Sequence, residues 1–155
     1  MKLSNEIREF ILPKRNVTES YAHRTSSKEV AEIIMREGFR FSDSFQKTTD
    51  QIIDDLVYIR YWDSLRKHYG GYIVIIAISQ KVIDEVLKKI PSSIEVQQAL
   101  SNVVEASEDS DDEPAYLLPK QYIKGYLERE TGRIVANEDF NPDFFPHVLN
   151  LKQTR

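Results

Sequence analysis

The chain has 155 residues, a mass of 18.1 kDa and a formal net charge of −4, with 41% hydrophobic and 30% charged residues. This composition is typical of a soluble globular protein, and the absence of cysteine excludes disulfides, thiolate nucleophiles and cysteine-based zinc sites. The longest apolar run, Tyr72 to Ile78, is too short to cross a bilayer, and no signal peptide is expected because charged residues interrupt the first 20 positions. We therefore expect a single domain over residues 1–155.

The helices predicted from apolar periodicity and capping residues are concentrated in the N-terminal half of the chain. The pattern first predicts a polar lead-in over 1–19, with a short helix ended by Pro13, and then a strand over 21–25. A helix is expected from a capping box of Ser26 and Glu29 to Gly38, followed by a strand around Phe39 and Phe41. The pattern then predicts a long helix from Asp50 to Gly70, a strand over 72–79, a helix over 81–90 and a helical turn or two within 94–104. The strand over 72–79 is apolar on both faces, so we expect it at the centre of a sheet.

The negative charge is concentrated after these elements. Six acidic residues and no basic one lie between Glu105 and Glu113, and the net charge would be +2 without them. Because like charges repel and apolar residues are few, we expect residues 105–114 to form an acidic, mobile loop. The segment lacks the glycine and the spacing of an EF-hand, so a surface insertion explains it better than a calcium site. The rest of the chain is close to neutral, which does not oppose an anionic ligand.

The chain after the acidic loop favours strands. A strand is expected over 115–118, followed by a hairpin that pairs 122–128 with 133–136. Residues 137–155 contain three phenylalanines and two prolines, and we expect them to form an irregular tail. The predicted fold class is therefore α+β.

Three histidines are widely separated and form no metal-binding spacing, so no metal site is expected. His23 differs from the others because it lies on a strand that leads directly into a capped helix. The sequence of residues 21–26, followed by an amphipathic helix that ends in Gly-Phe, resembles the opening motif of the ADP-ribosyltransferase superfamily. A strand histidine can bond a ribose hydroxyl, and Thr25 and Ser26 bring hydroxyls to a helix N-terminus, where amides attract anions. A half-buried histidine before an ordinary capped helix is the alternative explanation.

The resemblance implies a split β-sheet core and NAD as the substrate, bound between the strand of His23, the helix after Ser26 and the segment of Phe45. The residues expected to contact NAD are Tyr21, His23, Arg24, Thr25, Ser26, Phe45 and Thr48. Phe45 would supply an aromatic surface for nicotinamide, where the family usually has tyrosine. Arg24 would contact a phosphate or point to solvent.

The family's catalytic glutamate begins a later strand, at the position that Ala115 occupies here. A carboxylate there would stabilise an oxocarbenium-like transition state, which alanine cannot do. Three interpretations stay open. Glu113 serves instead, although Pro114 restricts its backbone; the chain is a divergent or inactive member; or alanine has replaced a glutamate by engineering. Gln121 completes the candidate catalytic set.

The implied function is NAD-dependent transfer of ADP-ribose to a protein acceptor, by a toxin or effector that acts in the cytoplasm or is delivered into a target cell. A nucleic-acid acceptor has weaker support, because Arg60, Arg66 and Lys67 are the only notable basic group and suit the solvated face of a helix. A non-enzymatic interaction domain, or an inactive pseudoenzyme, that uses the acidic loop and aromatic surface is the alternative.

Overall fold

The structure is a computed structural model that describes residues 4–42, 45–54, 71–90, 96–104 and 115–146. Its elements in chain order are α1 (Asn5–Ile11), β1 (Thr18–Thr25), α2 (Lys28–Glu37), β2 (Phe39–Phe41), α3 (Phe45–Thr48), β3 (Asp50–Ile52), β4 (Tyr72–Ser79), α5 (Gln80–Leu87), α6 (Val96–Ala99), β5 (Asn102–Val104), β6 (Ala115–Leu118), the 3₁₀ helix η2 (Lys120–Tyr122), β7 (Ile123–Glu128) and β8 (Arg133–Ala136). The predicted acidic loop lies outside the described residues. None of the described helices is long and apolar enough to cross a membrane.

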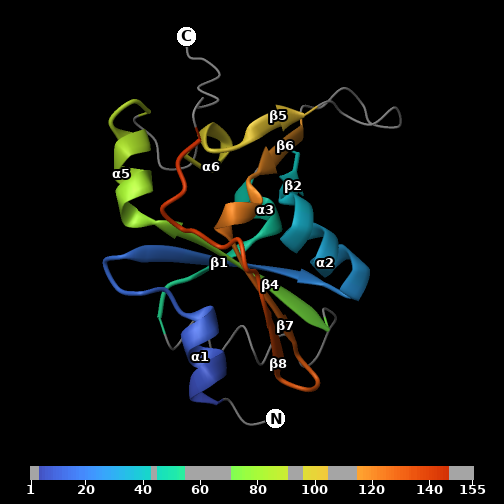
Figure 1. The fold of residues 1–155 in the computed structure, drawn as a ribbon. Helices are drawn as coiled ribbons and strands as arrows, with labels where there is room; N and C mark the ends of the chain where they lie inside the picture. Colours follow the sequence, from blue (N-terminus) through green and yellow to red (C-terminus); the bar gives the residue numbers. More distant parts are fainter. Residues whose placement is uncertain (1–3, 43–44, 55–70, 91–95, 105–114, 147–155) are drawn as a thin grey trace.

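The strands form two antiparallel sheets (Figure 1). The larger sheet has the order β3-β1-β4-β7-β8, and the smaller sheet has the order β2-β6-β5. The prediction that residues 72–79 form a central strand is confirmed, since β4 is flanked on both sides and all its residues except Tyr72 are buried. The mixed α+β class is confirmed as well. The described α-helices all precede residue 100, but α5 and α6 lie beyond the middle of the chain, so helices are not confined to the N-terminal half.

Two hydrophobic cores lie on opposite faces of the larger sheet, because successive residues of a strand point to opposite sides. Tyr21 and Val74 belong to the core shared with α2, α5 and the smaller sheet. Ala22 and Ile75 belong to the core covered by α1. Figure 1 shows α1 on one side of β1, with the smaller sheet on the other. The two faces can therefore carry different sites.

The long helix predicted from Asp50 is wrong at its start. Residues 50–52 form β3, which pairs antiparallel with β1 and places Ile52 opposite Ser20. Ile52 is 1% exposed, so its burial at the sheet edge outweighs the local helix-start signal. Residues 55–70, which would form the rest of that helix, lie outside the described residues. Within 94–104 the predicted helical turn is present as α6, but residues 102–104 form the edge strand β5.

Helix α2 begins one residue later than the predicted capping box. Ser27 is the N-cap, and its Oγ accepts a hydrogen bond from the Val30 amide at 3.1 Å. The Thr25 hydroxyl accepts from the Ser27 amide at 3.1 Å. Ser26 is exposed and does not cap the helix. The Thr25 hydroxyl, which was expected to contact a ligand, therefore accepts a hydrogen bond in the turn that leads into α2.

The described parts of the predicted lead-in and of the predicted tail are both fixed to the body of the domain. The α1 side chains Ile7, Phe10 and Ile11 are buried in the second core. After β8 the chain has no helix or strand through residue 146, yet hydrogen bonds hold it in place. The Ser79 amide donates to the Pro142 carbonyl at 2.8 Å, and the Tyr122 hydroxyl donates to a carbonyl of the same segment.

Candidate functional site

His23 lies on β1 at the point where the larger sheet meets β2 and α3. Its Nδ1 is 2.8 Å from the Thr48 carbonyl oxygen, and its ring centroid is 4.9 Å from that of Phe39. Because a carbonyl oxygen can only accept, Nδ1 carries the proton, and Nε2 of the neutral ring is a hydrogen-bond acceptor. The strand and this bond hold the ring in one orientation. The arrangement suits a ligand hydroxyl that donates to Nε2.

A pocket of about 220 Å³ lies beside this histidine. Its walls come from β1, α2 and the start of β2, and the lining residues are His23, Val30, Ile33, Ile34, Glu37, Gly38, Phe39 and Arg40. The pocket has an apolar wall, and three of its residues carry ionisable side chains. Sites for drug-sized ligands commonly measure about 300–1,000 Å³. This pocket therefore accommodates one ring system of a ligand rather than a whole dinucleotide.

Gly38 gives the pocket its shape where α2 ends and β2 begins. Its φ is 107°, and a Cβ at this position would lie 2.5 Å from the Leu118 carbonyl oxygen. A side chain would both strain the backbone and clash with β6. Glycine thus lets α2 end against β6 immediately before Phe39, whose ring centroid lies 4.9 Å from that of His23. The Gly-Phe pair of the motif has a steric reason in this fold.

Arg24 does not share the pocket with its neighbour His23. Its guanidinium lies 3.8 Å from the Asp50 carboxylate, and Asp50 is paired in register with Ala22. Arg24 therefore points to the face of the sheet that α1 covers, as strand alternation requires. A phosphate bound beside His23 would meet the other face. This placement does not support the contact expected for Arg24.

Tyr21 and Phe45 pack in the first core rather than line the pocket. They are 5% and 2% exposed, and their ring centroids lie 5.0 Å apart in an edge-to-face arrangement. The Tyr21 hydroxyl donates to the Glu19 carboxylate and accepts from the Gln97 amide at 3.0 Å. Burial, followed by the bond to Glu19, raises the pKa of Tyr21 far above its usual value. These rings support the strand that carries His23.

Thr48 is brought to His23 through its main chain. Its carbonyl accepts the His23 bond, while its hydroxyl donates to the Phe45 carbonyl at 3.0 Å. The next residue, Thr49, donates to the same carbonyl at 2.8 Å and is buried. The predicted association of His23 with the segment of Phe45 and Thr48 is therefore present. It orients the His23 ring through the Thr48 carbonyl, and the side chains of Phe45 and Thr48 do not line the pocket.

The candidate catalytic residues lie apart from this pocket. Ala115 begins β6 opposite Val104, on the face of the smaller sheet opposite to the buried Tyr116. Gln121 lines a different cleft, of about 610 Å³. Glu113 lies outside the described residues. Among the described residues that line the His23 pocket, none comes from β6, and the carboxylate that does line it is Glu37.

Sequence reasoning missed the apolar wall and the charged residues of the pocket. Val30 and Ile33 lie on the apolar stripe of α2, which the sequence predicts as an ordinary amphipathic helix. Val30 is in fact 40% exposed, and Ile33 is half-buried. A pocket wall and a core face share the same helical periodicity, so the pattern cannot separate them. Glu37 and Arg40 gave no signal that distinguished them from ordinary surface charges.

Among the described residues, no group of three or more histidine, aspartate or glutamate side chains is placed to hold a metal ion. Comparisons with protein-family models, with curated proteins and with solved structures found no match. A functional proposal therefore depends on the motif around His23 and on the geometry of its pocket.

Proposed function

We propose that this chain binds NAD through the His23 pocket and is an ADP-ribosyltransferase-like protein with a protein acceptor. The observation that carries the proposal is the position of His23, whose Nδ1 lies 2.8 Å from the Thr48 carbonyl oxygen and donates to it. In the neutral ring this tautomer leaves Nε2 as a hydrogen-bond acceptor. A ribose hydroxyl would donate to Nε2. The attached ring would lie against the apolar wall formed by Val30 and Ile33.

The arrangement of the elements supports the same proposal. Two antiparallel sheets agree with the split core that the resemblance implies. The strand of His23, the helix α2 and the Gly-Phe strand follow one another in the expected order. The strand that begins at Ala115 pairs directly with β2, with Tyr116 opposite Phe41.

The transfer reaction requires a group that stabilises the transition state, in addition to the residues that bind NAD. The bond between nicotinamide and ribose breaks, nicotinamide leaves with the electron pair, and the acceptor nucleophile attacks the anomeric carbon and loses its proton. A carboxylate that stabilises the positive charge of the transition state accelerates this step. Since Ala115 supplies no charge, we expect NAD binding with slow transfer.

Isothermal titration with NAD tests the binding step in three proteins: the wild type, His23→Ala and Arg24→Ala. Loss of the His23 bond leaves a ligand hydroxyl unpaired, and we expect binding to weaken about tenfold. Arg24→Ala is the matched control, because it changes the next residue of the same strand on the opposite face. We expect it to leave the affinity unchanged. Absence of binding by the wild type, or an equal loss in both variants, would reject the proposal.

Release of nicotinamide from NAD tests the transfer step separately. We expect Ala115→Glu to raise the rate above that of the wild type, because it places a carboxylate at the position where the resembled family has one. If NAD binds but the rate stays unchanged, the assignment of position 115 is wrong while the binding site stands.

One observation favours a protein-interaction domain as a second candidate. Val103 of the edge strand β5 is 55% exposed, and β5 leads directly into the acidic segment 105–114. An edge strand can pair with an extended segment of a partner. Deletion of residues 105–113 should then abolish capture of a partner, whereas an NAD-binding enzyme would keep its nucleotide affinity.

A further inference from the structure

The cleft that Gln121 lines, of about 610 Å³, adjoins the His23 pocket. This Gln121 cleft is bounded by the end of α2, the smaller sheet, η2 and the segment after β8. Glu37 lines both the cleft and the His23 pocket. Arg40, which lines the pocket, is paired in register with Leu117, which lines the cleft. The two sites are therefore neighbours along the end of α2 and across the smaller sheet.

The Gln121 cleft combines amide side chains with apolar surfaces. Gln121 is half-buried and Asn102 is exposed, and neither side-chain amide has a hydrogen-bond partner among the described residues. Pro119 and Phe144 also line the cleft. A glutamine amide can donate to N7 of adenine and accept from its 6-amino group, and an aromatic ring can stack on the base. The lining therefore has the chemistry that recognises an adenine base.

The two cations of the cleft are already paired with carboxylates. The Arg36 guanidinium lies 3.5 Å from the Glu37 carboxylate, and the Lys120 ammonium lies 3.1 Å from that of Asp139. The cleft therefore suits an uncharged base better than a phosphate group. Arg40, which stands between the two sites, is exposed, and no ion pair among the described residues uses its guanidinium. A guanidinium in this position can bind the oxygens of a phosphate.

We propose that the Gln121 cleft binds the adenosine part of NAD, so that one dinucleotide occupies both sites with its pyrophosphate beside Arg40. The inference rests on the proposed function, in which the nicotinamide ribose binds in the His23 pocket. That pocket, of about 220 Å³, accommodates one ring system, and the cleft provides the space for the other end of the dinucleotide. Gln121, which the sequence places in the catalytic set, then has a role in binding.

Isothermal titration with two dinucleotides tests the assignment. One is NAD, and the other is nicotinamide hypoxanthine dinucleotide, in which a carbonyl replaces the 6-amino group of adenine. We expect the wild type to prefer NAD about tenfold, as for one bidentate contact between an amide and adenine. Gln121→Ala should lose this preference and bind NAD about tenfold more weakly. Gln80→Ala is the matched control, because Gln80 is also half-buried and lines neither site, and it should keep the preference.

The wild type decides the question even if Gln121→Ala does not fold. Equal affinity of the wild type for the two dinucleotides, or a preference that survives in folded Gln121→Ala, would overturn the assignment of the cleft and leave the His23 site standing. His23→Ala should weaken both dinucleotides alike and keep the preference for adenine. Absence of NAD binding by the wild type would overturn this assignment and the proposed function together.

Discussion

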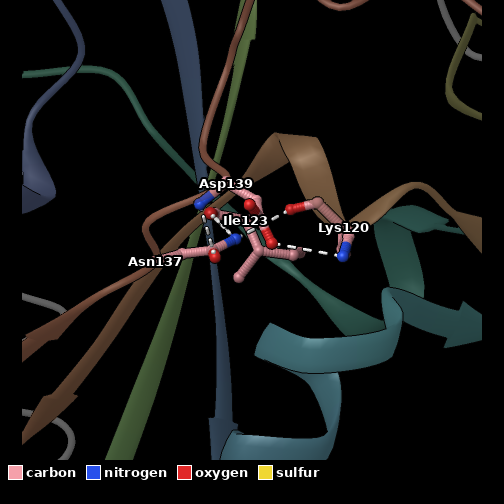
Figure 2. A network of polar contacts seen from close by, with 4 residues as sticks. All are labelled: Lys120, Ile123, Asn137 and Asp139. Atoms are coloured by element: carbon pink, nitrogen blue, oxygen red, sulfur yellow. Dashed lines mark hydrogen bonds and ion pairs between the residues drawn. The ribbon is translucent and has the colours of Figure 1, made fainter.

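Asn137 fixes the chain after β8 to the turn that precedes β7 (Figure 2). Its Nδ2 donates to the carbonyls of Lys120 and Ile123 at 3.0 and 2.8 Å, and its Oδ1 accepts from the Asp139 amide at 3.1 Å. A hydrogen bond of this kind contributes about 1 kcal/mol net. With three such bonds on a half-buried side chain, Asn137→Ala should lower the free energy of unfolding by about 2–3 kcal/mol.

Two further substitutions distinguish the stability contributed by the hydrogen bonds of Asn137 from that contributed by the exposed ion pair of Asp139. Asn137→Asp keeps the acceptor but turns a carboxylate oxygen toward two carbonyls, so we expect at least the same loss. Asp139→Ala removes the ion pair with Lys120, whose two charged atoms lie 3.1 Å apart between side chains that are 40% and 60% exposed. Exposed pairs contribute about 0–1 kcal/mol. Urea unfolding followed by circular dichroism measures all three variants, provided that the slope against denaturant is unchanged.

The reasoning would be refuted if Asn137→Ala cost no more than Asp139→Ala. That result would mean that the polar contacts of Asn137 are replaced by water without loss. The segment after β8 would then be held by its other hydrogen bonds, among them those to Ser79 and Tyr122.

Two other predictions concern the helix beside the pocket. Gly38→Ala should destabilise the protein by about 1–3 kcal/mol, because its Cβ would meet the Leu118 carbonyl oxygen. Gly71→Ala is the control and should destabilise it less, because a Cβ at that position has no atom within 4 Å. Thermal unfolding compares the two variants. Burial, and then the bond to Glu32 of α2, raises the pKa of Tyr126 to about 12 from 10.0. The stability from this raised pKa should be present below pH 10 and disappear as the pH rises through 12. When unfolding is measured across that range, the decline should be smaller in Tyr126→Phe than in the wild type, because Tyr21, whose pKa is also raised, remains.

The sequence predicts best the elements whose signal is local and strong. The run from Tyr72 to Ser79 is apolar on both faces, and only a central strand or a buried helix suits such a run; its β-branched residues decide between them. The strand β3 escapes prediction for the opposite reason. It has three residues, a helix-start signal precedes it, and its pairing partner β1 lies far away in the chain.

Part of the site could have been placed without a structure. His23 and Arg24 are neighbours on a strand, so alternation alone puts their side chains on opposite faces. The burial of Phe45 could not be predicted, because it depends on three rings from two other strands, Tyr21 of β1 and Phe39 and Phe41 of β2. The role of Thr48 is also invisible in the sequence, since its backbone carbonyl rather than its hydroxyl contacts the histidine.

The most direct test of the proposed function is an NMR titration of the isotopically labelled protein with NAD. We predict that the signals of His23 and of the pocket residues Val30, Ile33 and Phe39 shift with one common saturation curve. The signals of Arg24 and Asp50, on the other face of the sheet, should move little. No shift at saturating NAD, or shifts confined to residues away from the pocket, would contradict the account.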